Sequence, residues 1–171
     1  MPGDPAGTTG PDSVDDIERL RARRGNRPRT LLELPHSQLD QQPSDPAIRE
    51  DLAARAFALS GVIEEPSGVS VPGARALVLQ PDAAGTRVGA FLVGREFAHL
   101  HPGPDFSLHL ALPQHEAQRA VDAGWAEWHP LAAAGRVPKT IVMVYAPRDA
   151  EELETVWSLL QASHRFATDH E

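Results

Sequence analysis

Residues 95–113 (REFAHLHPGPDFSLHLALP) constrain the fold most, because their side chains alternate with the period of two that is typical of β-strands. Before the turn, Phe97, His99 and His101 are predicted to share one face. After the turn, His109 alternates with leucines that face the opposite side. The turn PGPD lies between the two halves and predicts a β-hairpin. This hairpin would bring histidines of both strands to one side of a sheet.

Three helices are predicted from signals at their ends. For the first helix, Asp45 is the predicted N-cap and Pro46 takes the first helical position, and Gly61 is placed to end the helix. A second helix is predicted over residues 113–123, where a proline opens it and a glycine follows it. The last helix begins at Asp149, which stands three residues before a glutamate, the spacing of a capping box.

Short β-like runs separated by turn signals fill the space between these helices. The run TIVMVY is so apolar that we expect it in the middle of the sheet. The pattern predicts an α+β single domain, with a mostly antiparallel sheet of five to six strands and two or three helices packed on one face. The predicted strands cover residues 62–64, 74–80, 86–93, 96–101, 106–112, 125–129 and 140–145.

The N-terminal arm, residues 1–44, differs in composition from the rest of the chain. Seven of the sixteen prolines fall in residues 1–47, and the arm has few apolar side chains with which to close a core. We predict a partly disordered, flexible arm, disordered over residues 1–12, with one short helix at 14–24. Residues 45–168 form the predicted compact domain.

The chain has no cysteine and eight histidines, which excludes disulfides, cysteine-ligated metals and a cysteine nucleophile. Its formal net charge is -8, and after residue 30 it has ten basic against nineteen acidic side chains. An acidic domain repels phosphate backbones and anionic lipids, so we expect no nucleic-acid and no membrane partner. The sequence shows no apolar run of the roughly 20 residues that span a bilayer and no secretion signal, so we expect a cytoplasmic protein.

Alternation divides the histidines into two groups. His99, His101 and His109 are predicted on one face of the hairpin, and a strand at 125–129 adds His129 and Glu127 to the same side. We interpret this group as the floor of a pocket. The remaining histidines are expected in a linker, at a helix start, in the last helix and at the terminus, as surface or helix-end groups. They are His36, His115, His164 and His170.

Three interpretations of the histidine group stay open. The imidazoles are suited to general acid/base work, with Glu127 or Asp105 orienting a ring. Alternatively, His99, His101 and His109 are a reasonable ligand set for Zn, Fe or Mn. Otherwise the histidines are half-exposed groups on a solvated sheet face. A catalytic triad of Asp105, Ser107 and His109 is rejected, because residues two apart on one strand project in parallel about 7 Å apart.

Four further residues are candidates for lining the same pocket and contacting a substrate. They are Arg95, Ser107, Trp125 and Tyr145. Arg95 is expected to stabilise developing negative charge. Trp125 and its neighbour Trp128 point to opposite sides of a strand, so one of the two tryptophans is expected in the core and the other near a ligand or partner.

The chain resembles the luciferase-domain family of bacterial and fungal proteins. The resemblance is carried by EFAHLHPGPDFSLHLALP, AGWAEWHPLA and VMVYAPRDAEELETVWSLLQASHRFA, and it covers about residues 45–168. It implies oxygenation of a hydroxylated pyrone by molecular oxygen, through a peroxide that loses carbon dioxide, with no required organic cofactor. The matching positions are His99, His101, Gly124 and His129, with Glu127 and Trp125 nearby, and the sequence is closer to the bacterial members.

We therefore expect a small-molecule enzyme, oxygenase-like or proton-transferring, with a pocket floored by the histidine group. The alternatives are a non-catalytic ligand-binding or interaction module and a histidine-ligated metal enzyme. We predict no cofactor for this enzyme; the alternative is that it binds a divalent metal ion. The expected partner is a small-molecule substrate, and a homodimer stays open.

Overall fold

The protein is described here by a computed structural model covering residues 15–170, and the expected disorder of residues 1–12 lies outside this range. Within it, six strands form one antiparallel sheet in the order β3-β4-β5-β6-β8-β7. The apolar run TIVMVY supplies β8, which lies inside the sheet, as predicted. The strands are Val62–Pro66 (β3), Arg75–Leu79 (β4), Glu96–Leu100 (β5), Leu108–Ala111 (β6), Ala126–Trp128 (β7) and Ile141–Val144 (β8).

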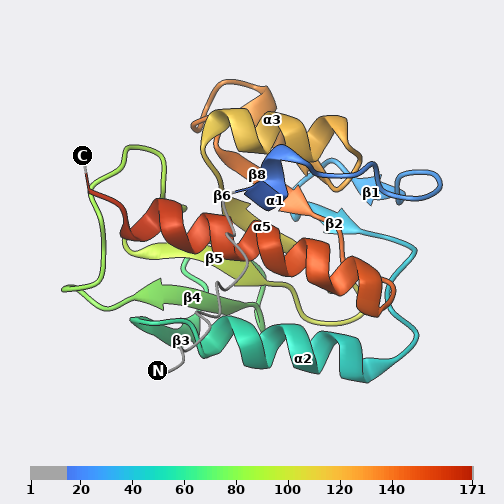
Figure 1. The fold of residues 1–171 in the computed structure, drawn as a ribbon, viewed down its shortest axis with the longest axis horizontal. Helices are drawn as coiled ribbons and strands as arrows, with labels where there is room; N and C mark the ends of the chain where they lie inside the picture. The colour runs from blue at the N-terminus through green and yellow to red at the C-terminus, as the bar shows by residue number, and fades with distance from the viewer. Residues whose placement is uncertain (1–14, 171) are drawn as a thin grey trace, which may run out of the picture.

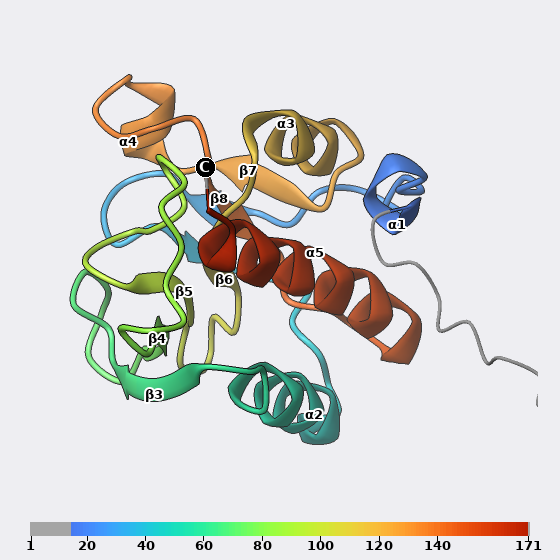
Figure 2. The same cartoon turned by 60° about the vertical axis from the view of Figure 1, so that its left-hand side comes forward.

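Three helices cover one face of this sheet, which confirms the predicted α+β class (Figures 1 and 2). They are Pro46–Phe57 (α2), Gln114–Asp122 (α3) and Ala150–Thr168 (α5). Asp45 caps α2 by accepting a hydrogen bond from Ala47 N at 2.9 Å, and Asp149 caps α5, as the local signals predict. None of the helices between residues 15 and 170 combines the length and the apolar character needed to cross a membrane.

The core lies between the sheet and these helices, and the N-terminal arm contributes to it. Ile17, on the short helix Asp15–Glu18 (α1), is only 2% exposed and belongs to the core cluster. This helix is shorter than the predicted 14–24. Beyond the helix, Arg23 N donates to Ala123 O at 2.8 Å, which ties the arm to the end of α3.

The opposite face of the sheet carries the histidines and is partly covered by a small hairpin. This hairpin joins Thr30–Leu31 (β1) to Ser37–Gln38 (β2), which pair antiparallel. Gln38 N donates to Asp105 Oδ1 at 3.0 Å, and this contact holds the hairpin against the turn between β5 and β6. The helix Pro130–Ala133 (α4) follows β7 beside the same face.

The predicted strand at 86–93 is wrong. These residues form part of the loop between β4 and β5, and their backbone groups bond to segments far away in the sequence. Thr86 N donates to Asp169 O at 2.9 Å, and Gly89 O accepts from Thr140 Oγ1 at 2.7 Å. The apolar side chains that suggested a strand include Val88, which is 81% exposed.

Phe97 was predicted to share a sheet face with His99 and His101, and this prediction is wrong. The pairing of β4 with β5 shifts by one residue, so that Leu77 opposes Ala98 while Val78 opposes Glu96. This bulge leaves Phe97 in the core against α5, with its ring 5.8 Å from that of His164. Because one residue is inserted, Glu96 takes the place beside His99 that alternation assigned to Phe97.

Candidate functional site

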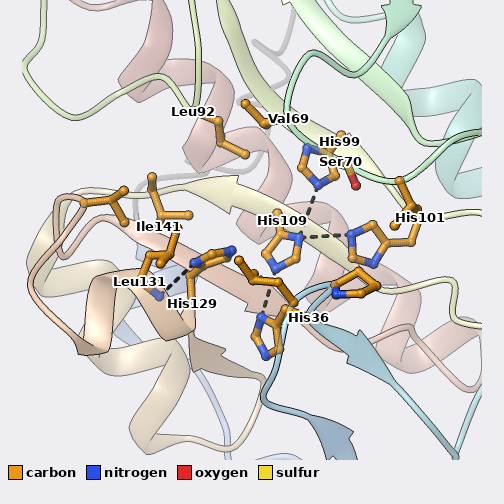
Figure 3. Close-up of a pocket in the computed structure, with 14 residues that line it drawn as sticks. His36, Val69, Ser70, Leu92, His99, His101, His109, His129, Leu131 and Ile141 are labelled. Atoms are coloured by element: carbon orange, nitrogen blue, oxygen red, sulfur yellow. Dashed lines mark hydrogen bonds between the residues drawn. The ribbon is translucent and has the colours of Figure 1, made fainter.

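Five histidines line a pocket of about 480 Å³ on the face opposite the long helices (Figure 3). They are His36, His99, His101, His109 and His129. The rest of the lining is mostly aliphatic, and includes Leu92, Leu131 and Ile141. The structure therefore brings the predicted group of four histidines together at one pocket, and one further histidine joins it.

The predicted hairpin brings the first three histidines together. His99 on β5 lies directly opposite His109 on β6, and His101 follows β5 with its N donating to Ser107 O at 2.9 Å. His129 follows β7, which pairs with the inner strand β8. The turn sequence and strand parity are sufficient to place these groups.

His109 lies at the centre of the cluster (Figure 3). Its Nδ1 is 3.2 Å from His99 Nε2 and 3.0 Å from His101 Nε2, and its Nε2 is 3.0 Å from His36 Nδ1. His99, His101 and His109 are only 3%, 7% and 4% exposed. These three are therefore not half-exposed groups on a solvated sheet face.

His36 corrects the prediction of a surface histidine in a linker, because it is 2% exposed. The turn between β1 and β2 inserts its ring between His109 and Glu127. Its position is set by tertiary contacts of the hairpin, and the local sequence LPHS carries no pattern that would have revealed it. His115 has a side chain 70% exposed and His164 bonds to Ser60 O, so both lie apart from the cluster, as predicted.

Three carboxylates hold the outer nitrogens of the cluster. Glu96 Oε1 lies 2.7 Å from His99 Nδ1, and Asp105 Oδ2 lies 2.6 Å from His101 Nδ1. Glu127 Oε1 lies 2.5 Å from the Nε2 atom of His36. Among these acids, Asp105 and Glu127 were predicted to orient imidazoles, whereas Glu96 was missed because only the β-bulge turns it to this face.

Burial raises the pKa of each of these carboxyl groups, but hydrogen bonds outweigh it. For Glu96 the donors are His99, Ser67 Oγ and the Gly68 backbone, and they leave its pKa lowered. Hydrogen bonding by the neighbouring histidine and other donors likewise lowers the pKa of Asp105 and of Glu127. All three groups are therefore ionised at pH 7.

Three of the imidazoles have lowered pKa values, which favour their neutral form. Burial lowers the pKa of His99 despite the hydrogen bond with Glu96. Burial and the surrounding imidazoles hold the pKa of His109 well below its ordinary value. The pKa of His129 is lowered to about 4, mainly by burial, while its Nδ1 accepts a hydrogen bond from Leu131 N at 3.1 Å. Neutral His129 therefore carries its proton on Nε2.

Ser107 and Tyr145 act on the carboxylates and do not line the pocket. Ser107 is fully buried, and its hydroxyl donates to Asp105 Oδ1 at 2.6 Å. The hydroxyl of Tyr145 donates to Glu127 Oε2 at 2.9 Å, and burial beside Glu127 raises the pKa of Tyr145 to about 12. Both hydroxyls therefore hold a carboxylate in place.

Arg95 and Trp125, also predicted to contact a substrate, lie away from the pocket. The guanidinium of Arg95 donates to Leu79 O at the β4–β5 side of the sheet. Trp125 is 5% exposed and packs in the core, where its Nε1 donates to Arg21 O at 2.7 Å.

Two overlapping groups of three histidines have the spacing of metal ligands. His99, His101 and His109 form one group, and His36, His109 and His129 form the other. Within each group, one nitrogen per ring lies within 4.8 Å of the others. The ring of His109 belongs to both groups. Imidazole nitrogens suit Zn, Fe, Cu and Ni.

Comparison with known proteins identifies the domain that carries these residues. Proteins named luciferase from Armillaria gallica, Armillaria mellea and Neonothopanus nambi are 42%, 40% and 38% identical to this chain over 77 residues. The aligned stretch covers 44% of this chain and 29% of each relative. The chain thus matches less than a third of the length of these curated relatives. No solved structure matches the chain.

The model of the Luciferase domain family matches residues 94–163. This stretch contains His99, His101, His109 and His129, whereas His36 lies outside it. Residues 94–163 therefore match the Luciferase domain family, as the sequence motifs predicted.

Proposed function

We propose that this chain is an oxygenase-like enzyme that acts on a small organic molecule in the histidine pocket. One observation carries the proposal: five imidazoles, three of them backed by buried or partly buried carboxylates, converge on the floor of an otherwise largely aliphatic pocket. A volume of about 480 Å³ lies within the range of roughly 300–1,000 Å³ usual for small-molecule sites. A concave site of this kind favours an enzyme over an interaction module with a flat face.

The lining indicates the class of substrate. Leu34 and Val69 line the pocket while remaining 62% and 54% exposed, so the entrance is apolar. Among the described residues that line the pocket there is no arginine or lysine, which leaves the imidazoles to recognise any acidic group. These features suit a mostly apolar molecule that carries one acidic enol or phenol hydroxyl.

The proposed reaction begins when the cluster takes up the proton of that hydroxyl. His129 Nε2–H is available to donate to the substrate oxygen and stabilise the anion. The enolate then supplies the electron pair for a new carbon–oxygen bond to molecular oxygen, and the returned proton completes a hydroperoxide. The names of the related luciferases support this assignment. The residues proposed to take part are His99, His101, His109, His129 and Glu127, together with His36.

Oxygen uptake with a panel of hydroxypyrones and polyphenols tests this function. For a substrate that the wild type consumes, His129→Gln is expected to lower kcat/KM by about 100-fold or more. The exposed His115→Gln serves as the matched control and is expected to retain the wild-type rate. Equal rates in wild type and His129→Gln would contradict the mechanism. Tight binding of a panel compound without oxygen uptake would instead indicate a binding module.

A further inference from the structure

We propose that the cluster is a mononuclear site for a divalent transition metal, bound by His99 Nε2, His101 Nε2 and His109 Nδ1 (Figure 3). The inference concerns the same pocket as the proposed function. It rests on that function only for what the ion does, because binding of the ion is measured separately from turnover.

The distances between the three inner nitrogens suit one ion. His109 Nδ1 lies 3.2 Å from the Nε2 atom of His99 and 3.0 Å from that of His101. Nitrogens that bind one Zn²⁺ at about 2.0–2.1 Å with tetrahedral angles lie about 3.4 Å apart. These two distances differ from that spacing by only a few tenths of an ångström, and one nitrogen of each ring lies within 4.8 Å of the others.

The outer nitrogens of two of these ligands are held as metal-binding histidines usually are. His99 Nδ1 contacts Glu96, which is 3% exposed, and His101 Nδ1 contacts Asp105. A carboxylate on the far ring nitrogen fixes the tautomer and leaves the inner nitrogen as a lone pair. The two negative charges also match the double positive charge of the ion.

The arrangement of protons supplies an independent argument. Because the Nδ1 protons of His99 and His101 point to carboxylates, both of their Nε2 atoms present lone pairs to His109. If His109 carries its proton on Nε2, three lone pairs face one another. If it carries the proton on Nδ1, its Nε2 lone pair faces His36 Nδ1, which is also a lone pair in the neutral tautomer of His36 that donates from Nε2 to Glu127.

One cation between the three inner nitrogens removes this conflict. His109 can then keep its proton on Nε2 and donate it to His36 Nδ1, and His36 Nε2–H continues to Glu127. In this arrangement the four rings can all be neutral, and each ring nitrogen has either a hydrogen-bond partner or the ion. A buried polar group that lacks such partners destabilises the fold, so the metal form is the satisfied one.

The second histidine group fits an ion less well. His129 Nδ1 already accepts a hydrogen bond from Leu131 N, and no carboxylate within residues 15–170 forms a hydrogen bond with its ring. An ion bound to His36, His109 and His129 would take the Nε2 atom of His109. The Nδ1–H of His109 would then be the single proton shared by the Nε2 lone pairs of His99 and His101. We therefore place the ion on the side of His99 and His101.

The first ligand group leaves coordination positions for a substrate. His99, His101 and His109 supply three nitrogens and all line the pocket, so a fourth position can receive water or the oxygen of an enolate. Three protein ligands with an open position are typical of catalytic rather than structural metal sites. In the proposed function the ion would hold the substrate anion at the pocket floor.

Metal titration of the untagged full-length chain tests the inference. After removal of metal with a chelator and dialysis, Zn²⁺ and Co²⁺ are added separately, and bound metal is measured by elemental analysis after gel filtration. The wild type is expected to bind one equivalent. His99→Asn and His109→Asn are expected to weaken binding by more than 100-fold, whereas the matched pocket variant His129→Asn is expected to retain the equivalent.

Positioning by the carboxylates is tested with Glu96→Gln, which keeps the shape of the side chain. This variant is expected to bind Zn²⁺ about 10–100-fold more weakly than wild type and to change the visible spectrum of bound Co²⁺. Circular dichroism verifies that each variant is folded. The spectrum and stoichiometry of wild type decide the question even if a ligand variant fails to fold.

Three results would overturn the inference. They are a folded wild type that binds neither ion, binding that is unchanged in His99→Asn, and binding that is lost in His129→Asn but kept in His99→Asn. A proton would then be the cation that satisfies the cluster. Failure of the proposed function is distinct, because it would appear as one bound equivalent of metal with no oxygen uptake on any panel substrate.

Discussion

His109 determines the chemistry of the cluster, because both of its ring nitrogens contact other imidazoles. A neutral imidazole has one N–H and one lone pair, so the two sides of His109 are never equivalent. A proton on Nδ1 of neutral His109 leaves Nε2 as a lone pair facing His36, whereas a metal ion on Nδ1 leaves Nε2–H to donate to His36. The four hydrogen-bonded rings, His36, His99, His101 and His109, therefore respond as one unit.

Glu152 at the start of α5 allows a test of buried charge away from the pocket. It is 1% exposed and accepts hydrogen bonds from Arg148 N and Arg148 Nε, both at 2.9 Å. Burial raises the pKa of Glu152, but the donors of Arg148 outweigh this effect, so its pKa is lowered. We expect Glu152→Gln to lower the free energy of unfolding at pH 7 by about 1–3 kcal/mol.

The pH dependence of this difference has a defined sign. A lowered folded pKa stabilises the protein above the ordinary value of 4.5, and this contribution is lost as the pH falls through the folded pKa. Urea unfolding at pH 7 and pH 3.5 should therefore show the gap between wild type and Glu152→Gln narrowing. The exposed Glu154→Gln should cost less than about 0.5 kcal/mol at pH 7. A gap that is independent of pH would contradict the role of charge.

Single residues also show where sequence reasoning reaches its limit. Alternation placed His99, His101 and His109 together because strand parity is a local property. His36 lies 73 residues before its partner His109, and only the docking of a two-stranded hairpin brings them into contact. Glu96 reaches the cluster through a bulge that is visible in the pairing with β4 and not in the sequence.

At the scale of elements, the helices were predictable because their caps are local. Asp45 and Asp149 each accept a backbone hydrogen bond at the start of a helix, and the sequence shows both residues directly. The loop at 86–93 was not predictable, since its backbone meets β5 only at its end, at Glu96, while Thr86 N and Gly89 O bond to Asp169 and Thr140. The apolar residues of that loop give a strand-like sequence pattern, but the segment does not form a ladder of hydrogen bonds with another strand.

The N-terminal arm is the element whose contribution to stability is least expected from composition. Ile17 is 2% exposed within the core cluster, and α1 contacts both α3 and α5. Truncating a buried isoleucine to alanine removes buried surface and leaves a cavity. We expect Ile17→Ala to lower the free energy of unfolding by about 2–4 kcal/mol, measured by urea denaturation.

Leu39 provides the control for this prediction. It is also in the arm but is 51% exposed, so Leu39→Ala should cost less than about 1 kcal/mol. If the two variants have equal effects, the arm does not pack on the core in solution. In that case residues 45–168 would be the stable unit, as proposed from composition.

At the scale of the whole molecule, the pocket depends on segments that are far apart in the chain. The β1–β2 hairpin, the β5–β6 hairpin and the end of β7 each contribute histidines to one floor. The three long helices on the opposite face hold the sheet that aligns the last two segments (Figure 2). The three proposed ligands lie on the β5–β6 hairpin, and the unfolded chain does not hold them in the geometry that binds one ion.

Binding of a metal should therefore stabilise the entire fold. An ion that binds only the native state adds about 2.7 kcal/mol when its free concentration is 100 times its Kd, which corresponds to a rise in Tm of about 5–10 °C for a chain of this size. Thermal melts followed by circular dichroism should show Tm increasing with the logarithm of the free Zn²⁺ concentration, and a chelator should reverse the increase. The double variant His99→Asn, His101→Asn should melt at one temperature with and without Zn²⁺. An equal rise in both proteins would mean that Zn²⁺ binds elsewhere, and no rise in wild type would mean that folding assembles the histidines for protons alone.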